Sequence, residues 1–237
     1  NFGIDGHNFW LQHLRHLELL KYNKKPKTII FIVDIWTLEK RRDLYESAQF
    51  LPYMLWNKTI QDYTVSYVGY DYLDYYIPLV RYAGQRNSLK AAINNASICK
   101  IYDKYRFRGF KSMDRKWNND LENAMLNEKT YISQLDNKSI TLFEKFIKNC
   151  IHNRIQLIFI YPPEQIDGQK FVSNREEAID LFNNLTCKYS LKFIDYSKDS
   201  LCFDKKYFYN ATHLNNLGSE IFSRNLASRL KADGITE

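Results

Sequence analysis

The chain has 237 residues, of which 45% are hydrophobic and 26% charged, and its formal net charge is +7. This is the composition of a globular protein, and it excludes collagen-like and intrinsically disordered chains. The basic residues are scattered, and no helix-turn-helix, RNA-binding, zinc-finger or C-x-x-C signature accompanies them. We therefore assign the positive charge to a solvated surface and expect no nucleic-acid partner.

The chain opens with a helical pattern of apolar residues over 8–22, which a nearly continuous apolar run over 28–35 follows. Such runs, rich in Ile, Val and Phe, are typical of parallel strands that are covered on both faces of the sheet. Further strand patterns cover 155–161 and 191–196, and further helical patterns cover 139–152, 176–189 and 216–230. This alternation predicts βαβ units and a parallel sheet with right-handed crossovers.

The middle of the chain, residues 46–137, interrupts this alternation. It is rich in Tyr, Asn and charged residues, and its periodicity is weak. We interpret it as a mostly helical insertion between two strands, with helices over 70–82 and 88–98. No internal repeat or linker indicates a second domain, so the sequence predicts one domain of the α/β class. Long insertions of this kind form binding surfaces at the carboxyl ends of parallel strands.

A histidine lies directly before the last helical pattern, in the segment Tyr-Asn-Ala-Thr-His-Leu-Asn that ends at Asn215. Asn215 is expected to be the N-cap of that helix. His213 would then lie on a loop at the carboxyl edge of the sheet, where an imidazole can act as a general base near neutral pH. The alternative is that His213 is a capping or packing residue.

The residues around this histidine carry a family resemblance. His213, Leu214, Asn215 and Gly218 resemble the D-x-x-H-L block and the following N-x-x-G of SGNH/GDSL-type hydrolases and their cell-surface O-acyltransferase relatives. The chain departs from that block at Asn210, which stands where the family has an aspartate. An asparagine carbonyl can still accept the histidine Nδ1–H, although it supplies no negative charge. Nearby carboxylates that could orient the histidine instead are those of Asp195, Asp199 and Asp204.

Two further segments resemble blocks of the same family. Gly3 and Gly6 match its N-x-G-x-x-G block, whose glycine N–H helps to form the oxyanion hole, although a plain strand-to-helix turn would explain them equally well. Asp34 stands where the third block belongs, and the alternative is that it caps the next helix. The Tyr-Pro-Pro-Glu segment at 161–164 is similar to a loop common in these relatives and is expected to be the wall of a cleft.

The resemblance implies a three-layer α/β/α flavodoxin-like domain that acts as an esterase or O-acyltransferase on acyl groups of a carbohydrate or cell-envelope polymer. His213 would be the base, Asn210 would orient it, Gly3 or Gly6 would support the oxyanion, and Asp34 would complete the site. The family nucleophile is a serine that would lie upstream of residue 1. The expected partner is an acylated carbohydrate or a small ester, with no metal or cofactor.

The resemblance also implies a bacterial periplasmic or cell-surface location. Membrane contact would occur only through an N-terminal anchor that has been removed. The alternative function is not catalytic: the asparagine at position 210 and the lack of a matching serine also fit a degenerate hydrolase that serves glycan binding or envelope assembly.

Overall fold

The computed structural model describes residues 9–39, 50–51, 55, 57–64, 69–87, 89–90, 93 and 113–235. The chain divides into two compact units. The first unit consists of Asn1–Lys25, Leu38–Phe110 and Leu135–Phe146, and the second of Pro26–Thr37, Lys111–Gln134 and Ile147–Glu237. The segment predicted as an insertion is therefore shared between the two units, because residues 111–134 belong to the second.

The second unit contains a parallel sheet. In the described part of the chain its order is β1 (Thr28–Ile32), β2 (Gln156–Tyr161), β3 (Lys192–Asp195), with Ile30 opposite Ile158 and Phe159 opposite Phe193. The prediction of three parallel strands, and with it the α/β class, is confirmed. The first strand is shorter than predicted, because Asp34 and Thr37 hydrogen-bond each other in a turn that follows it.

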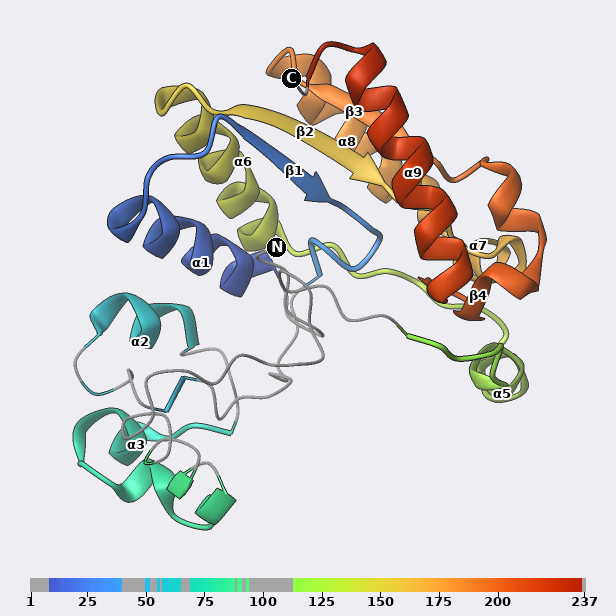
Figure 1. The fold of residues 1–237 in the computed structure, drawn as a ribbon. Coiled ribbons are helices and arrows are strands. Elements are labelled where there is room, and N and C mark those ends of the chain that lie inside the picture. The colour runs from blue at the N-terminus through green and yellow to red at the C-terminus, as the bar shows by residue number, and fades with distance from the viewer. Residues whose placement is uncertain are drawn as a thin grey trace. The chain divides into compact units, whose positions relative to one another are not determined.

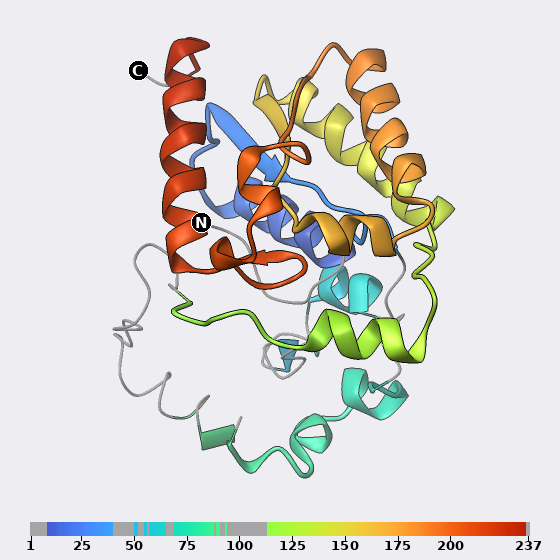
Figure 2. The ribbon, with the colours of Figure 1, turned by 90° about the vertical axis from the view of Figure 1, so that its right-hand side faces the viewer.

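Helices cover both faces of this sheet. On one face, Ile158, Ile160 and Ile194 pack in one cluster with residues of α9 (Asn216–Ala232), among them Phe222 and Leu230. On the other face, Phe193 contacts Phe182 of α8 (Arg175–Lys188), with ring centroids 6.5 Å apart. Figures 1 and 2 show the strands between α9 on one side and α8 on the other.

The covering of the sheet is incomplete at β1. Five of the six residues of β2 are buried, which matches the continuous apolar run in the sequence. In β1, however, Ile30 and Ile32 are 43% and 46% exposed, although they lie in register with the buried Ile158 and Ile160. The prediction that β1 is covered on both faces is therefore wrong for the face that these two isoleucines occupy, because the α9 cluster is built on β2 and β3.

The second unit also contains short elements, most of which follow β2 or β3 along the chain. They are α5 (Asp120–Asn127), α7 (Ile166–Phe171), the 3-10 helices η3 (Ser200–Phe203) and η4 (Lys205–Tyr207), and the antiparallel pair β4 (Phe208–Asn210) and β5 (His213–Leu214). They are too short for an apolar period to reveal them in the sequence. Local caps define them instead: the Gln165 side chain accepts the N–H groups of Asp167 and Gly168 and so starts α7.

The described part of the first unit is helical. It contains α1 (Phe9–Tyr22), α2 (Lys58–Thr64), α3 (Tyr72–Tyr76), the 3-10 helix η2 (Val80–Tyr82) and the first turns of α6 (Asn137–His152), which continues into the second unit. Phe9 packs on Phe143 with ring centroids 4.8 Å apart. The single helix predicted over 70–82 is wrong: Pro78 and a left-handed Leu79 with φ 70° separate α3 from η2. The helix predicted over 88–98 lies mostly outside the described residues.

Candidate functional site

The histidine turn, residues 210–213, connects β4 to β5. Asn210 and His213 pair across it, and the Asn210 side chain folds it. Asn210 Oδ1 accepts the backbone N–H of His213 at 2.9 Å and that of Thr212 at 3.2 Å. Because backbone N–H groups can only donate, these two bonds determine which atom of the Asn210 amide points into the turn.

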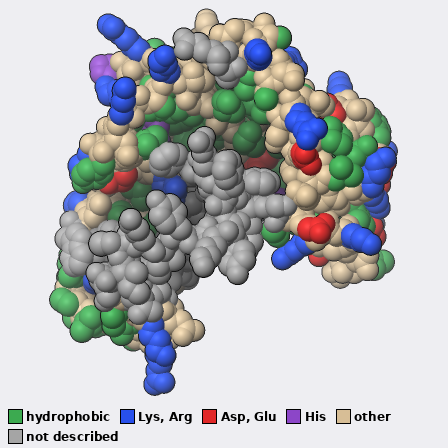
Figure 3. Space-filling view, viewed as in Figure 1, with side chains coloured by type: hydrophobic (Ala, Val, Ile, Leu, Met, Phe, Trp, Pro, Cys, Tyr) green, Lys and Arg blue, Asp and Glu red, His purple; other side chains and the backbone are tan. Residues whose placement is uncertain are grey.

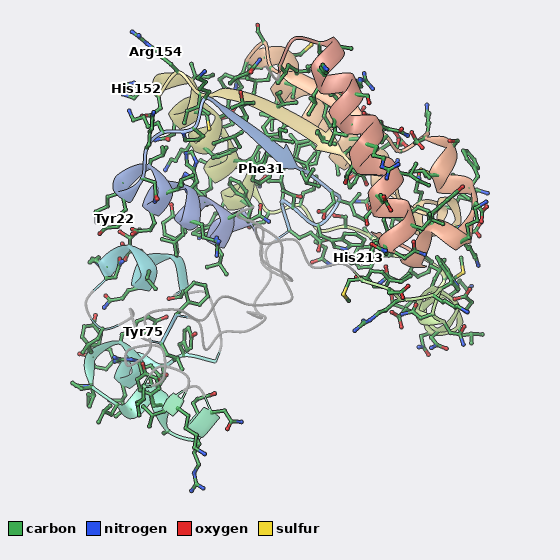
Figure 4. The ribbon with its side chains drawn as sticks, in the orientation of Figure 1. Tyr22, Phe31, Tyr75, His152, Arg154 and His213 are labelled. Atoms are coloured by element: carbon green, nitrogen blue, oxygen red, sulfur yellow. The ribbon has the colours of Figure 1, made fainter. Side chains whose placement is uncertain are left out.

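The Nδ1 atom of the His213 imidazole lies close to two polar side-chain atoms. Nδ1 lies 2.9 Å from Asn210 Oδ1 and 2.9 Å from Thr212 Oγ1, and the ring stacks on Tyr209 at a centroid distance of 5.3 Å. The side chain is exposed, close to the start of α9 (Figure 4). When Nδ1–H donates to Asn210, the lone pair is on Nε2, and Nε2 can accept a proton from a group that approaches from solvent.

The loop after β2 anchors the histidine turn. The backbone N–H of Gln165 donates to the Ala211 carbonyl at 2.9 Å. Gly168, in the first turn of α7, has no room for a side chain, because a Cβ there would lie 2.7 Å from the Cβ of Ala211. The turn is thus held by backbone contacts from the carboxyl end of β2, a position at which α/β proteins carry functional groups.

The N-x-x-G part of the motif connects the turn to α9. The Asn215 side chain accepts the N–H of Gly218 at 3.0 Å, so the prediction that Asn215 is the N-cap is confirmed. A Cβ at Gly218 would collide with the Tyr207 carbonyl and would lie 2.9 Å from Leu214 Cδ2. Packing therefore explains the glycine at position 218: without a side chain it lets α9 begin against the strand pair of β4 and β5, which carries His213.

The three aspartates considered as alternative orienters have local roles. Asp195 accepts the N–H and hydroxyl of Ser197, Asp199 caps η3, and Asp204 caps η4 and pairs with Lys206 at 2.7 Å. At the histidine, Asn210 supplies the amide oxygen that lies 2.9 Å from Nδ1. The structure therefore brings together His213 and Asn210, as the motif predicts.

Asp34 lies after the end of β1. Its Oδ1 accepts the Trp36 N–H at 3.0 Å and the Thr37 hydroxyl at 2.8 Å, which closes a turn over residues 35–38. The alternative prediction that Asp34 caps a helix is therefore wrong at this position, because a turn follows it. Burial is the main cause of the raised pKa of Glu164 and of Tyr161, and the negative charge of Asp34 adds to it in both cases. Gly3 and Gly6 lie outside the described residues.

The Glu164 cluster, formed by Tyr161, Glu164 and Arg175, is buried below the same loop. The Tyr161 hydroxyl donates to Glu164 Oε2 at 2.7 Å, and Arg175 Nε lies 3.6 Å from that oxygen. The Arg175 guanidinium stands 4.9 Å from the centroid of the Tyr161 ring. Burial raises the pKa of Glu164 to about 7, although the Tyr161 hydroxyl and the Arg175 charge favour the ionised form. Burial likewise raises the pKa of Tyr161.

This cluster corrects the prediction for residues 161–164. The sequence predicts the wall of a cleft there, but Tyr161, Pro163 and Glu164 are buried and Pro162 is half-buried. Sequence reasoning missed Glu164, Arg175, Gln165 and Gly168 as supports of the site. The one available signal was a glutamate directly after an apolar strand, since a charged residue is rarely buried unless it has a partner.

One basic side chain lies near the histidine turn: the Arg115 guanidinium stands 6.0 Å from the centroid of the Tyr209 ring, on which His213 stacks. Lys205 pairs with Glu122 at 3.1 Å, and Lys192 pairs with Asp233 at 2.5 Å. On the face seen in Figure 3, Lys and Arg side chains are spread over the described surface, and acidic side chains lie among those at its right-hand side. In the part of the chain that the structure describes, no group of three or more His, Cys, Asp or Glu side chains could hold a metal ion.

Comparison with protein-family models and with curated protein sequences finds no match for this chain. The resemblance to the SGNH/GDSL type is therefore carried by the residues named above. Within residues 9–39, 113–235 and the shorter described stretches between them, no helix has the length and apolar character needed to cross a bilayer.

Proposed function

We propose that this chain transfers acyl groups as an SGNH-type esterase or O-acyltransferase, with His213 as the general base. The observation that carries the proposal is the 2.9 Å contact between Asn210 Oδ1 and His213 Nδ1. An exposed imidazole that is held at Nδ1 by an acceptor matches the general arrangement of a base in acyl transfer.

In the proposed reaction, a serine from the chain before Asn1 attacks the acyl carbonyl, and His213 Nε2 takes the hydroxyl proton. The tetrahedral intermediate collapses, the ester bond breaks, and His213 returns the proton to the departing alkoxide. Water or a second hydroxyl group then accepts the acyl group from the serine by the same steps in reverse. Asn210 holds the ring, and the backbone at Gly3 or Gly6 would stabilise the oxyanion.

The finer fold, a three-layer flavodoxin-like domain, is part of the proposal. Its support is the parallel sheet between α9 and α8 and the placement of the histidine turn beside the loop that follows β2. The proposed substrate is an acylated carbohydrate or cell-envelope polymer, at the periplasmic or outer surface of a bacterium. The proposed chemistry uses no cofactor.

Hydrolysis of p-nitrophenyl acetate by the natural full-length protein tests the proposal. We expect His213→Ala to lower the rate at least ~10²-fold, the usual contribution of a general base. His152→Ala is the matched control, because His152 is an exposed histidine at the end of α6. Equal rates for wild type and His213→Ala would contradict the proposed role of His213. A wild type without turnover would favour the alternative, a degenerate hydrolase that binds glycans.

A further inference from the structure

A buried carboxyl group lies one residue before the backbone contact that holds the histidine turn. Glu164 is 4% exposed, and Tyr161 and Arg175 hold its side chain from β2 and α8. The next residue, Gln165, donates its N–H to Ala211 O at 2.9 Å. One peptide unit and one hydrogen bond therefore connect the Glu164 residue to the turn that carries His213.

The backbone of Glu164 is held by hydrogen bonds as well. Its carbonyl accepts Gln169 Nε2 at 2.8 Å, and the same Nε2 donates to the Ser197 carbonyl at 2.8 Å. The Cys202 thiol makes a hydrogen bond with the Glu164 backbone and donates to the Tyr196 carbonyl at 3.4 Å. The loop after β2 is thus joined to the loop after β3, and movement of Glu164 has to displace Gln165.

We propose that Glu164 is a positioning residue for His213: its buried side chain, clamped by Tyr161 and Arg175, fixes the loop from which Gln165 holds the histidine turn. This inference rests on the proposed function, in which His213 is the base. Glu164 itself touches no reacting atom. Its effect on the reaction is to keep the imidazole at the place where the serine hydroxyl approaches.

In the part of the chain that the structure describes, the titratable and charged groups that face Glu164 come from several elements. They are Tyr161 on β2, Arg175 on α8, Asp34 after β1 and Cys202 in η3. Desolvation and the Asp34 charge favour the neutral carboxyl group, whereas Tyr161 and Arg175 favour the carboxylate. Because burial outweighs the groups that favour the carboxylate, the pKa of Glu164 is about 7. The charge of Glu164 therefore changes near neutral pH, and we expect the histidine turn to respond to that change.

The test is NMR of the His213 ring in the natural full-length protein as a function of pH. The His213 signals are assigned by their loss in His213→Ala. Glu164→Gln keeps the size of the side chain and an acceptor for Tyr161, but it cannot ionise. Glu176→Gln is the matched control, because Glu176 contacts Arg175 from the solvent side with its side chain 80% exposed.

We expect the wild-type His213 signals to show an additional pH-dependent step near neutrality. Glu164→Gln should lose this step, and Glu176→Gln should keep it. Glu164→Ala should shift the His213 signals at every pH and lower kcat about tenfold with little change in KM, since a misplaced base slows the chemical step and not binding. Glu164→Gln should restore kcat.

Identical His213 signals in wild type and Glu164→Ala would overturn the inference. If Glu164→Ala does not fold, identical His213 titrations in wild type and Glu164→Gln would overturn it, because a change of charge in the Glu164 cluster would then not reach the histidine turn. The NMR signal requires no turnover. Coupling without ester hydrolysis would therefore contradict the proposed function and leave the positioning role intact. Hydrolysis that depends on His213 but not on Glu164 would overturn the positioning role alone.

Discussion

The side-chain oxygen of Asn210 lies 2.9 Å from Nδ1 of His213 and also accepts the backbone N–H of the same residue at 2.9 Å. One oxygen therefore both folds the turn and orients the ring. An aspartate could make the same contacts and would add a negative charge. The asparagine thus keeps the geometry of a histidine–acceptor pair and gives up only the electrostatic stabilisation of the imidazolium.

Substitution of Asn210 separates these two contributions. Asn210→Asp should raise ester hydrolysis by at least about tenfold, because the added charge stabilises the imidazolium that forms in the transition state. Asn210→Ala should lower hydrolysis by ~10²-fold, because both the ring and the turn lose their acceptor. The measurement is kcat for p-nitrophenyl acetate. A lower kcat in Asn210→Asp, with the fold intact by circular dichroism, would speak against Asn210 as the orienting residue.

The glycine of the N-x-x-G motif should be intolerant of a side chain. Gly218→Ala places a methyl group against the Tyr207 carbonyl and Leu214, so we expect a destabilisation of roughly 1–3 kcal/mol, the usual cost of overpacking. Ser223→Ala, at an exposed position of α9, is the control for a change to alanine in the same helix. The measurement is the midpoint of thermal unfolding of each variant. Equal midpoints for Gly218→Ala and Ser223→Ala would show that the close packing at Gly218 does not affect stability.

The buried Glu164 carboxyl should make stability depend on pH. Its pKa in the folded chain is about 7, above the ordinary value of 4.5. A carboxyl group with a raised pKa stabilises the fold fully below its unfolded pKa, and this contribution, roughly 3 kcal/mol, is lost as the pH rises through the folded pKa. Urea unfolding of wild type and Glu164→Gln should therefore show the variant gaining relative stability from about pH 5 to about pH 8.

A constant stability difference between those two pH values would contradict the raised pKa of Glu164. Glu220→Gln is the control for this experiment, because Glu220 pairs with Arg224 on the surface of α9 and is exposed. Its stability difference from wild type should stay within a few tenths of a kcal/mol at both pH values.

A buried histidine in the first unit should produce the opposite pH dependence. His13 on α1 is 5% exposed, its Nδ1 lies 2.7 Å from the Tyr63 hydroxyl, and it stacks near His16. Burial, with the charges of His16 and Lys145, lowers the pKa of His13 from 6.5 to about 4. The stability that the neutral ring supplies is therefore complete above pH 6.5 and is lost as the pH falls toward 4.

This loss should amount to roughly 3 kcal/mol, because lowering a pKa by one corresponds to about 1.4 kcal/mol. His13→Phe fills the site without a titratable group, so its urea midpoint should change less than that of wild type between about pH 7 and about pH 4.5. The exposed His152 supplies the control, His152→Gln, which should follow the wild type. Parallel curves for wild type and His13→Phe would assign the acid sensitivity to other groups.

The strands and long helices were predictable because their apolar period is continuous. The runs that became β1 and β2 and the helical pattern of α9 needed no long-range information. The predictions that were wrong depend on neighbouring elements or on single residues. The exposure of Ile30 follows from where α9 lies, and the end of α3 follows from Pro78 and Leu79.

In the candidate site, too, local contacts were predictable from the sequence and long-range contacts were not. His213, Asn210 and Asn215 were predictable because they lie within six residues, and their contacts are local. The Glu164 cluster was not predictable, because Arg175 contacts Glu164 from another element and no local sequence pattern indicates that contact. Backbone contacts such as that of Gln165 with Ala211 leave no trace in side-chain chemistry at all.

The position of the proton on His213 tests the central claim most directly. Nitrogen NMR of the imidazole distinguishes a neutral ring protonated at Nδ1 from one protonated at Nε2. The proposed base requires Nδ1–H, which donates to Asn210 and leaves the lone pair on Nε2. A ring protonated at Nε2, with Nδ1 accepting the Thr212 hydroxyl, would contradict it, because no lone pair would then face the approaching nucleophile.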